Sequence, residues 1–279
     1  AGFQNVTGVD EPTAALQSVL VYEQERLRFN AMDVCHLLMI DMGAGTTDLV
    51  LCRYAPFDEN PITLLSVWPS DNINTSFGGS EIDAALCAHL KTYLNNCGFL
   101  NTQNFEKKYL DKCKVWKEAN VSLALGKPDG VIAYCGFIDN MLEILGVERK
   151  FAMIDRTVFE NILSDYLVQF PLLVKDCLDA AHFDPAMLDC VLLTGGHSQW
   201  YFVSEMLSGK LTRFGEINLP KIQEEPDRLI QLQWPQETVA FGLVFQNIPL
   251  VPDIKPSTTT TAILHILADR FIAQHGYDF

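Results

Sequence analysis

One short stretch of the sequence combines the residue types that a phosphate-binding loop needs. An apolar segment, 37–40, ends in Asp41, and a second apolar segment follows Asp48. Between them lie Gly43 and Gly45. We expect a strand, a tight loop and a second strand, because short apolar runs bounded by turn residues are typical of buried strands. Glycines let a ligand approach the backbone N–H groups, and a concave ring of such groups suits a phosphate.

The carboxylate of Asp41 would face the phosphate bound in this loop. The two negative groups would repel each other unless a cation lay between them, so the loop predicts Mg²⁺ bound together with a nucleotide. The hydroxyls of Thr46 and Thr47 stand beside the loop. The alternative is an ordinary glycine-rich β-hairpin that binds nothing.

A second glycine-rich junction lies far along the chain. The buried strand expected over 190–194 runs into Gly195, Gly196 and His197, and then into a helix over 200–207. Backbone can lie flat against a ligand at such a junction, and a helix N-terminus attracts anions. The alternative is a tight strand–helix turn. His197 has no partner at the spacing of a catalytic triad, so we do not expect it to be catalytic.

Composition limits the classes of partner. The 279 residues are 48% hydrophobic, which supports one large or two moderate cores. The formal net charge of −15 disfavours nucleic acid and anionic membranes as partners. None of the eight cysteines lies in a Cys-x-x-Cys pair, so we expect reduced thiols. No targeting segment or membrane-spanning apolar run is recognised, and we expect a cytoplasmic protein.

Helical periodicity predicts two helices after the loop. Ser80 and Asp83 form a capping box for the first, and His89 falls on its apolar stripe as a core histidine. The second helix covers 105–125 and carries several lysines. A solvated basic face is the ordinary interpretation of such a run, and cationic cover for a nucleotide is the functional one. The lysines are Lys107, Lys108, Lys112, Lys114 and Lys117.

The second half of the chain alternates helix and strand. Asp155 can cap a long helical pattern, in which we expect a break or kink at Pro171. A strand is expected over 217–222 and a helix with one small-residue face over 235–244. The proline- and threonine-rich segment after it indicates a linker.

Five motifs occur in a fixed order, and together they resemble a known family. The chain is similar, over residues 1–248, to the nucleotide-binding domain of the seventy-kilodalton heat-shock chaperones (heat shock protein 70), in the actin-like ATPase superfamily. The motifs are Glu11-Pro12-Thr13-Ala14-Ala15, Asp41-x-Gly43-x-Gly45-Thr46-Thr47-Asp48, Phe77-Gly78-Gly79 with Asp83, Leu192-Leu193-Thr194-Gly195-Gly196 and Glu237-x-Val239-Ala240-Phe241-Gly242.

The resemblance implies an α/β fold, namely an actin-like ATPase (ribonuclease H-like) lobe with a mixed central sheet plus an inserted smaller α/β subdomain. The first lobe's own phosphate hairpin and catalytic lysine are not found, so the first lobe is expected to be largely missing. The implied divisions are a crossing segment and helix from the first lobe (1–36), the second-lobe core (37–76 and 164–248), the inserted upper subdomain (77–163), and a linker with a short C-terminal helix (249–279).

The resemblance also implies roles for individual residues toward ATP or ADP and Mg²⁺. Asp41 would orient the metal ion and the attacking water, and Glu11 would act near the metal-bound waters; on a purely local interpretation Glu11 only caps a helix. The phosphate loop would be Gly43, Ala44, Gly45 and Thr46 with Thr47 beside it, the adenosine motif Gly195, Gly196 and His197, and the adenine side Lys117 and Asn120.

The function that the resemblance implies is ATP binding and slow hydrolysis in a chaperone-like protein. Co-chaperones or unfolded client peptides would act through parts outside this chain, and the residues present are expected to be inactive alone and to self-associate through an apolar edge. Gln199 stands where the family has arginine, and Ala44 interrupts its glycine triplet. The alternatives are a degenerate, non-catalytic chaperone-like binding module, or a sugar or acetate kinase of the same superfamily.

Overall fold

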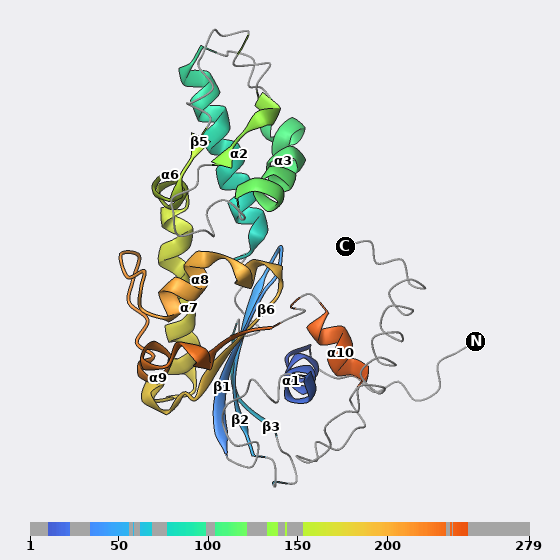
Figure 1. Ribbon diagram of the computed structural model, residues 1–279, viewed down its shortest axis with the longest axis vertical. Helices are drawn as coiled ribbons and strands as arrows, with labels where there is room; N and C mark the ends of the chain where they lie inside the picture. Colours follow the sequence, from blue (N-terminus) through green and yellow to red (C-terminus); the bar gives the residue numbers. More distant parts are fainter. Residues whose placement is uncertain are drawn as a thin grey trace, which may run out of the picture.

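A five-stranded mixed sheet forms the centre of the molecule, in the order β3-β2-β1-β6-β7 (Figure 1). Strands β1, β2 and β3 pair antiparallel, whereas β6 and β7 run parallel to β1. The predicted α/β class and mixed sheet are therefore confirmed. The strands are β1 (Cys35–Met42), β2 (Thr47–Tyr54), β3 (Ile62–Trp68), β6 (Cys190–Thr194) and β7 (Leu229–Gln231).

The computed structural model describes most but not all of the chain. The predicted linker and C-terminal helix lie outside the described part, as do residues 1–10 and 122–132. In the described part no helix is both long and apolar enough to cross a membrane. The described residues are 11–22, 34–55, 58, 62–68, 77–98, 104–121, 133–138, 143, 153–232, 235 and 237–244.

Helices cover both faces of the sheet (Figure 1). Alternate residues of β1 point to opposite faces: Leu38 and Ile40 join one buried cluster, and Leu37 and Met39 join another. The first cluster includes side chains of α7 (Ser164–Ala180), α8 (Tyr201–Leu207) and α9 (Pro220–Glu224). The second includes side chains of α1 (Glu11–Tyr22) and α10 (Thr238–Val244).

A second group of helices lies beyond the β1–β2 loop, in the upper part of Figure 1. A two-stranded antiparallel sheet, β4 with β5, accompanies them. The helix α3 continues into the π-helical turn η1. The bounds are α2 (Gly79–Asn96), α3 (Phe105–Trp116), η1 (Lys117–Val121), β4 (Ala133–Tyr134), β5 (Met153–Ile154) and α6 (Arg156–Ile162), with 3₁₀ turns η2 (Gly136–Ile138), η4 (Pro185–Met187), η5 (Gly196–Gln199) and η6 (Pro226–Arg228).

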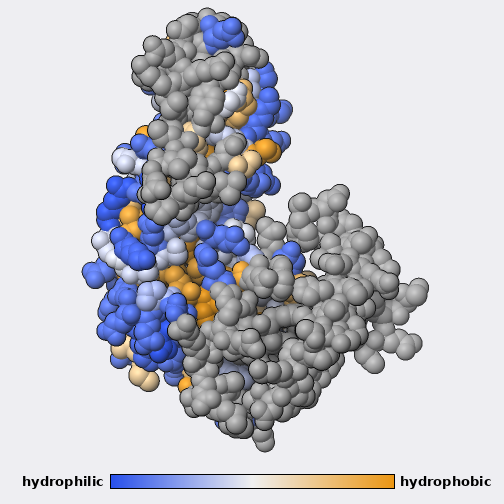
Figure 2. Space-filling model, viewed as in Figure 1, coloured by the Kyte–Doolittle hydropathy of each residue, from blue (hydrophilic) through white to orange (hydrophobic). Residues whose placement is uncertain are grey.

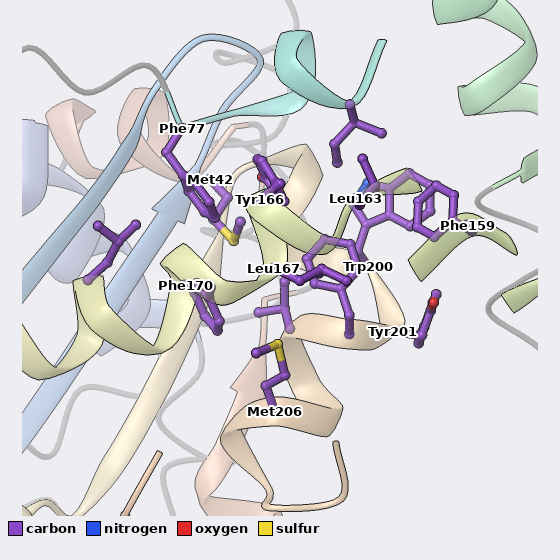
Figure 3. Packing of buried hydrophobic residues seen from close by; sticks show 14 of the residues in the cluster. Met42, Phe77, Phe159, Leu163, Tyr166, Leu167, Phe170, Trp200, Tyr201 and Met206 are labelled. Carbon is purple, nitrogen blue, oxygen red and sulfur yellow. The ribbon is translucent and has the colours of Figure 1, made fainter. Parts of the chain in front are cut away.

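Aromatic stacking joins these helices to α7 and α8. The ring of Phe77 stacks on Tyr166 with 4.1 Å between centroids, and Phe159 stacks on Trp200 with 5.1 Å between centroids (Figure 3). Outside the grey regions, the surface in Figure 2 is mainly hydrophilic, with hydrophobic residues gathered near the middle of the view. Most of the apolar side chains that the structure describes are buried, and those that are exposed include Leu64, Leu65 and Val67 of β3.

Two predictions about helix ends are wrong. The helix α2 begins at Gly79, and the Gly78 N–H donates to the Glu81 carboxylate (2.9 Å), so Ser80 and Asp83 do not form the capping box. Pro171 lies inside α7 without breaking it; the interruption falls at Leu163, between α6 and α7. Burial of this part of α7 against the sheet offsets the hydrogen bond that proline cannot donate.

Asp155 caps α6 as predicted, since its carboxylate accepts a hydrogen bond from the Val158 N–H (2.8 Å). The strand expected over 217–222 is not formed. Pro220 begins α9 instead, because its fixed φ and missing N–H suit the first position of a helix. The edge strand beside β6, on the side away from β1, is β7.

Candidate functional site

Three polar side chains line up where the central strands end. Asp41 is paired with Asp48 across the β1–β2 hairpin and with Thr194 of the parallel strand β6. Each lies two residues from a side chain in the cluster beneath α1 and α10, so all three point to that face of the sheet. The site is thus at the carboxyl ends of β1 and β6, where ligands of open α/β sheets bind.

The two glycine-rich segments meet at Asp41. Gly195 has φ +76°, a conformation that glycine adopts readily and other residues rarely do. A Cβ atom at Gly195 would overlap the Oδ1 atom of Asp41 and the carbonyl oxygen of Met42. The carboxylate therefore lies directly against Gly195, and only glycine leaves room for it.

The loop after β1 is held by its carbonyl groups. The Gly43 N–H donates to the Thr46 carbonyl (2.9 Å), and the carbonyls of Gly43 and Ala44 accept from the Gly79 (3.2 Å) and Ser80 (2.7 Å) N–H groups. Since a trans peptide places its C=O and N–H on opposite sides, the Ala44 and Gly45 N–H groups point away from α2. Both residues are exposed, so the loop that joins the strands of Asp41 and Asp48 offers two outward amide donors.

The two threonines of the loop have different surroundings. Thr46 is exposed, whereas Thr47 is buried and its hydroxyl donates to the Phe77 carbonyl (2.5 Å). Gly78 packs so closely that a Cβ atom there would lie 2.7 Å from the Ala44 carbonyl oxygen. The loop is therefore anchored to the segment that precedes α2.

Lys117 and His197, both predicted to contact a nucleotide, are bonded to each other in a buried polar cluster. The Lys117 side chain is 1% exposed, and its Nζ atom lies 3.1 Å from His197 Nε2. The same Nζ lies 2.8 Å from Asp83 Oδ1 and donates to the Gly79 carbonyl (3.0 Å). We call these four residues the Lys117 cluster.

The charges of the Lys117 cluster oppose protonation of its histidine. Burial, together with the ammonium groups of Lys117 and Lys114, lowers the pKa of His197 to about 4, so the imidazole is neutral at pH 7. Burial raises the pKa of Asp83, and the nearby Lys117 ammonium opposes that rise. The imidazole ring lies against Gly79, where a Cβ atom would overlap it.

The remaining predicted residues are placed as follows. Gly196 is exposed and begins η5. Glu11 begins α1, and Asn120 lies in η1, but their side chains are outside the described structure. Asp48 was not among the predicted site residues. The alternation of side chains along the hairpin could have identified it, because Asp48 lies two residues before Val50 and so points to the same face of the sheet.

The carboxylates at the sheet end are donors of the kind that hold a hard divalent cation such as Mg²⁺. Magnesium is held in proteins by one or two carboxylates and completes its octahedron with water and phosphate oxygens. Asp41 and Asp48 supply two carboxylates next to two outward amides. In the part of the chain that the structure describes, no group of three or more His, Cys, Asp or Glu side chains could hold a metal ion. No protein-family model matches the chain.

Proposed function

We propose that this chain binds the phosphates of a nucleotide together with Mg²⁺ at the carboxyl ends of β1 and β6, as part of a chaperone-like ATPase. One observation carries the proposal: the Asp41 carboxylate lies against the Gly195 turn while the Ala44 and Gly45 amides point outward beside it. Carboxylates and phosphates occupy one site only with a cation between them, and magnesium fits this donor set.

Each group has a stated role in this proposal. Asp41 and Asp48 hold the ion, directly or through its waters, and the amides of Ala44 and Gly45 donate to phosphate oxygens. Bound Mg²⁺ would supply neutralisation of the phosphate charge. Asp41 would also orient the attacking water, so that hydrolysis depends on positioning and electrostatic stabilisation without a covalent intermediate.

The finer fold assignment belongs to the same proposal. A mixed central sheet with helices on both faces, and a further helical region beyond the β1–β2 loop, supports a lobe of the actin-like ATPase (ribonuclease H-like) kind. ATP or ADP as ligand, and co-chaperones or client peptides as partners, follow from the resemblance alone.

Titration calorimetry with Mg-ADP and Mg-ATP tests the binding. We expect heat with magnesium and loss of binding by about tenfold or more in Asp41→Asn, because a neutral amide no longer holds the cation. Asp58→Asn is the matched control, since Asp58 is an exposed carboxylate paired with Arg53. Absence of heat up to millimolar nucleotide with wild-type protein would remove the proposal.

Turnover gives a second test when the complementary lobe is supplied. Asp41→Asn is then expected to lower the hydrolysis rate on the order of 10²-fold or more, as loss of a preorganised charge commonly does. An unchanged rate would show that Asp41 has another role.

One observation favours the second candidate, a non-catalytic binding module. The Lys117 ammonium, expected on the adenine side, is buried with three partners of its own. A module of this kind would keep the fold and act through partner proteins, without turning over ATP. Release of phosphate from Mg-ATP in the presence of the complementary lobe distinguishes the two candidates, since only the ATPase produces it.

A further inference from the structure

The Lys117 cluster joins three elements that are far apart in the sequence. Lys117 begins η1 after α3, Asp83 lies near the start of α2, and His197 lies in η5 after β6. Eighty residues separate the two side chains that meet at 3.1 Å. The cluster is therefore a tertiary junction placed directly behind the loop that carries the two outward amides.

The Lys117 ammonium is surrounded by partners within the protein. An ammonium group has three N–H donors and no acceptor. Three oxygen or nitrogen atoms lie within 3.1 Å of Nζ, namely those of Asp83, Gly79 and His197. The side chain is also 1% exposed, so a nucleotide in the site would not reach it without breaking this junction.

The contact with Lys117 fixes which nitrogen of His197 carries the proton. Because the ammonium only donates, Nε2 of His197 must be the acceptor of this hydrogen bond. A neutral imidazole with an unprotonated Nε2 carries its hydrogen on Nδ1. His197 thus carries an Nδ1–H donor, and the residue is half-buried, directly after Gly195 and Gly196 in the chain.

Gly79 transmits the position of this cluster to the phosphate loop. Its carbonyl accepts from Lys117, its N–H donates to the Gly43 carbonyl, and the His197 ring packs on its Cα. Loss of the Lys117 contacts would therefore disturb both the imidazole and the loop.

We infer that Lys117 is a positioning residue, which acts through His197 and Gly79 and does not touch the ligand, and that it holds His197 as a neutral Nδ1–H donor at the edge of the proposed nucleotide site. The part that concerns the ligand rests on the proposed function. The part that concerns the state of His197 does not.

NMR of the wild-type chain tests the state of His197 without any ligand. The imidazole signals are assigned by their absence in His197→Gln, and long-range ¹H–¹⁵N spectra report the tautomer. We expect the Nδ1–H form and no titration between pH 5.5 and 8. An Nε2–H tautomer, or a midpoint near 6.5, would overturn the inference.

Variants of Lys117 then test whether its ammonium group is what keeps the His197 imidazole neutral. In Lys117→Met the ring loses the nearest positive charge and its donor, so the His197 midpoint is expected to move upward into the range 5.5–6.5. Lys117→Arg keeps the charge and should keep His197 neutral; Lys107→Met, an exposed lysine of α3, should leave the titration unchanged. If His197 titrates in Lys117→Met as it does in wild type, Lys117 does not control the imidazole. If Lys117→Met does not fold, Lys117→Arg decides, and a His197 midpoint near 6.5 in that variant would refute the role of Lys117.

Binding of Mg-ADP at pH 5.5 and pH 7.5 provides the ligand readout. The wild-type Kd should change less than twofold between the two pH values, whereas that of Lys117→Met should change at least threefold, since His197 then becomes charged at the lower pH. A pH-independent Kd in Lys117→Met would overturn the coupling to the site. If wild-type protein binds no Mg-ADP at either pH, the proposed function fails while the NMR result still decides the state of His197.

Discussion

The two faces of the central sheet are packed by different means. Beneath α7 and α8 the cluster contains large aromatic side chains such as Phe170 and Phe202, which are fully buried. The other face has a cluster of mainly aliphatic side chains, and the two helices that cover it, α1 and α10, contact each other through their backbones. A Cβ atom at Gly242 would overlap the Ala14 carbonyl. Both faces bury apolar side chains, but only on the second does a close helix–helix contact require the absence of a side chain, at Gly242.

The candidate site belongs to the closely packed face. Asp41, Asp48 and Thr194 point to the side of α1 and α10, beyond the end of its apolar cluster. Aromatic packing on the opposite face holds the sheet without occupying this space. We therefore expect the removal of atoms to lower stability most on the aromatic face, and the addition of atoms to lower it most on the side of the site.

The largest expected effect on stability tests the aromatic face. Phe170→Ala removes a ring that is fully buried next to Phe77, and should lower the free energy of unfolding by about 3–5 kcal/mol. Urea unfolding measures it. Leu172→Ala is the control on the same helix, because Leu172 is 53% exposed and should change stability by about 0.5 kcal/mol or less. Equal losses in both variants would contradict the comparison.

A smaller effect is expected from one added methyl group on the other face. Gly242→Ala forces α10 away from Ala14 and should cost about 1–3 kcal/mol of unfolding free energy, although alanine is the better helix former. Thermal unfolding compares it with Leu243→Ala at the exposed neighbouring position. A Gly242→Ala variant as stable as wild type would mean that the backbones are not in close contact.

The smallest expected effect concerns pH and the Lys117 cluster. The pKa of His197 is lowered to about 4 in the folded chain, against 6.5 ordinarily, so between these values the unfolded state binds more protons. Stability should therefore fall as pH falls from about 6.5, by about 1 kcal/mol at pH 5.5. Urea unfolding at pH 7.5 and 5.5 should show a smaller drop in His197→Gln than in wild type. The raised pKa of Asp83 acts in the opposite sense, and Asp83 is present in both proteins.

Local sequence patterns were sufficient to predict several structural elements and insufficient to predict others. The hairpin around the loop and the cap at Asp155 depend on neighbours within a few residues, and both were predicted. Pro171 was misjudged because tertiary burial outweighs a missing hydrogen bond. The Ser80–Asp83 pattern was misjudged because Gly78 and Glu81 cap the helix earlier, while Asp83 pairs with Lys117.

The sequence by itself determined that two strands flank a glycine-rich loop ending beside a carboxylate, and that a glycine pair follows another buried strand, because hydrophobic period and glycine content are local properties. Only the tertiary structure decided that Asp41 lies against Gly195, that Asp48 stands beside it, and that Lys117 turns inward to His197. Those contacts depend on strand register and on which polar groups become buried together, and neither is encoded in the spacing of residues along the chain.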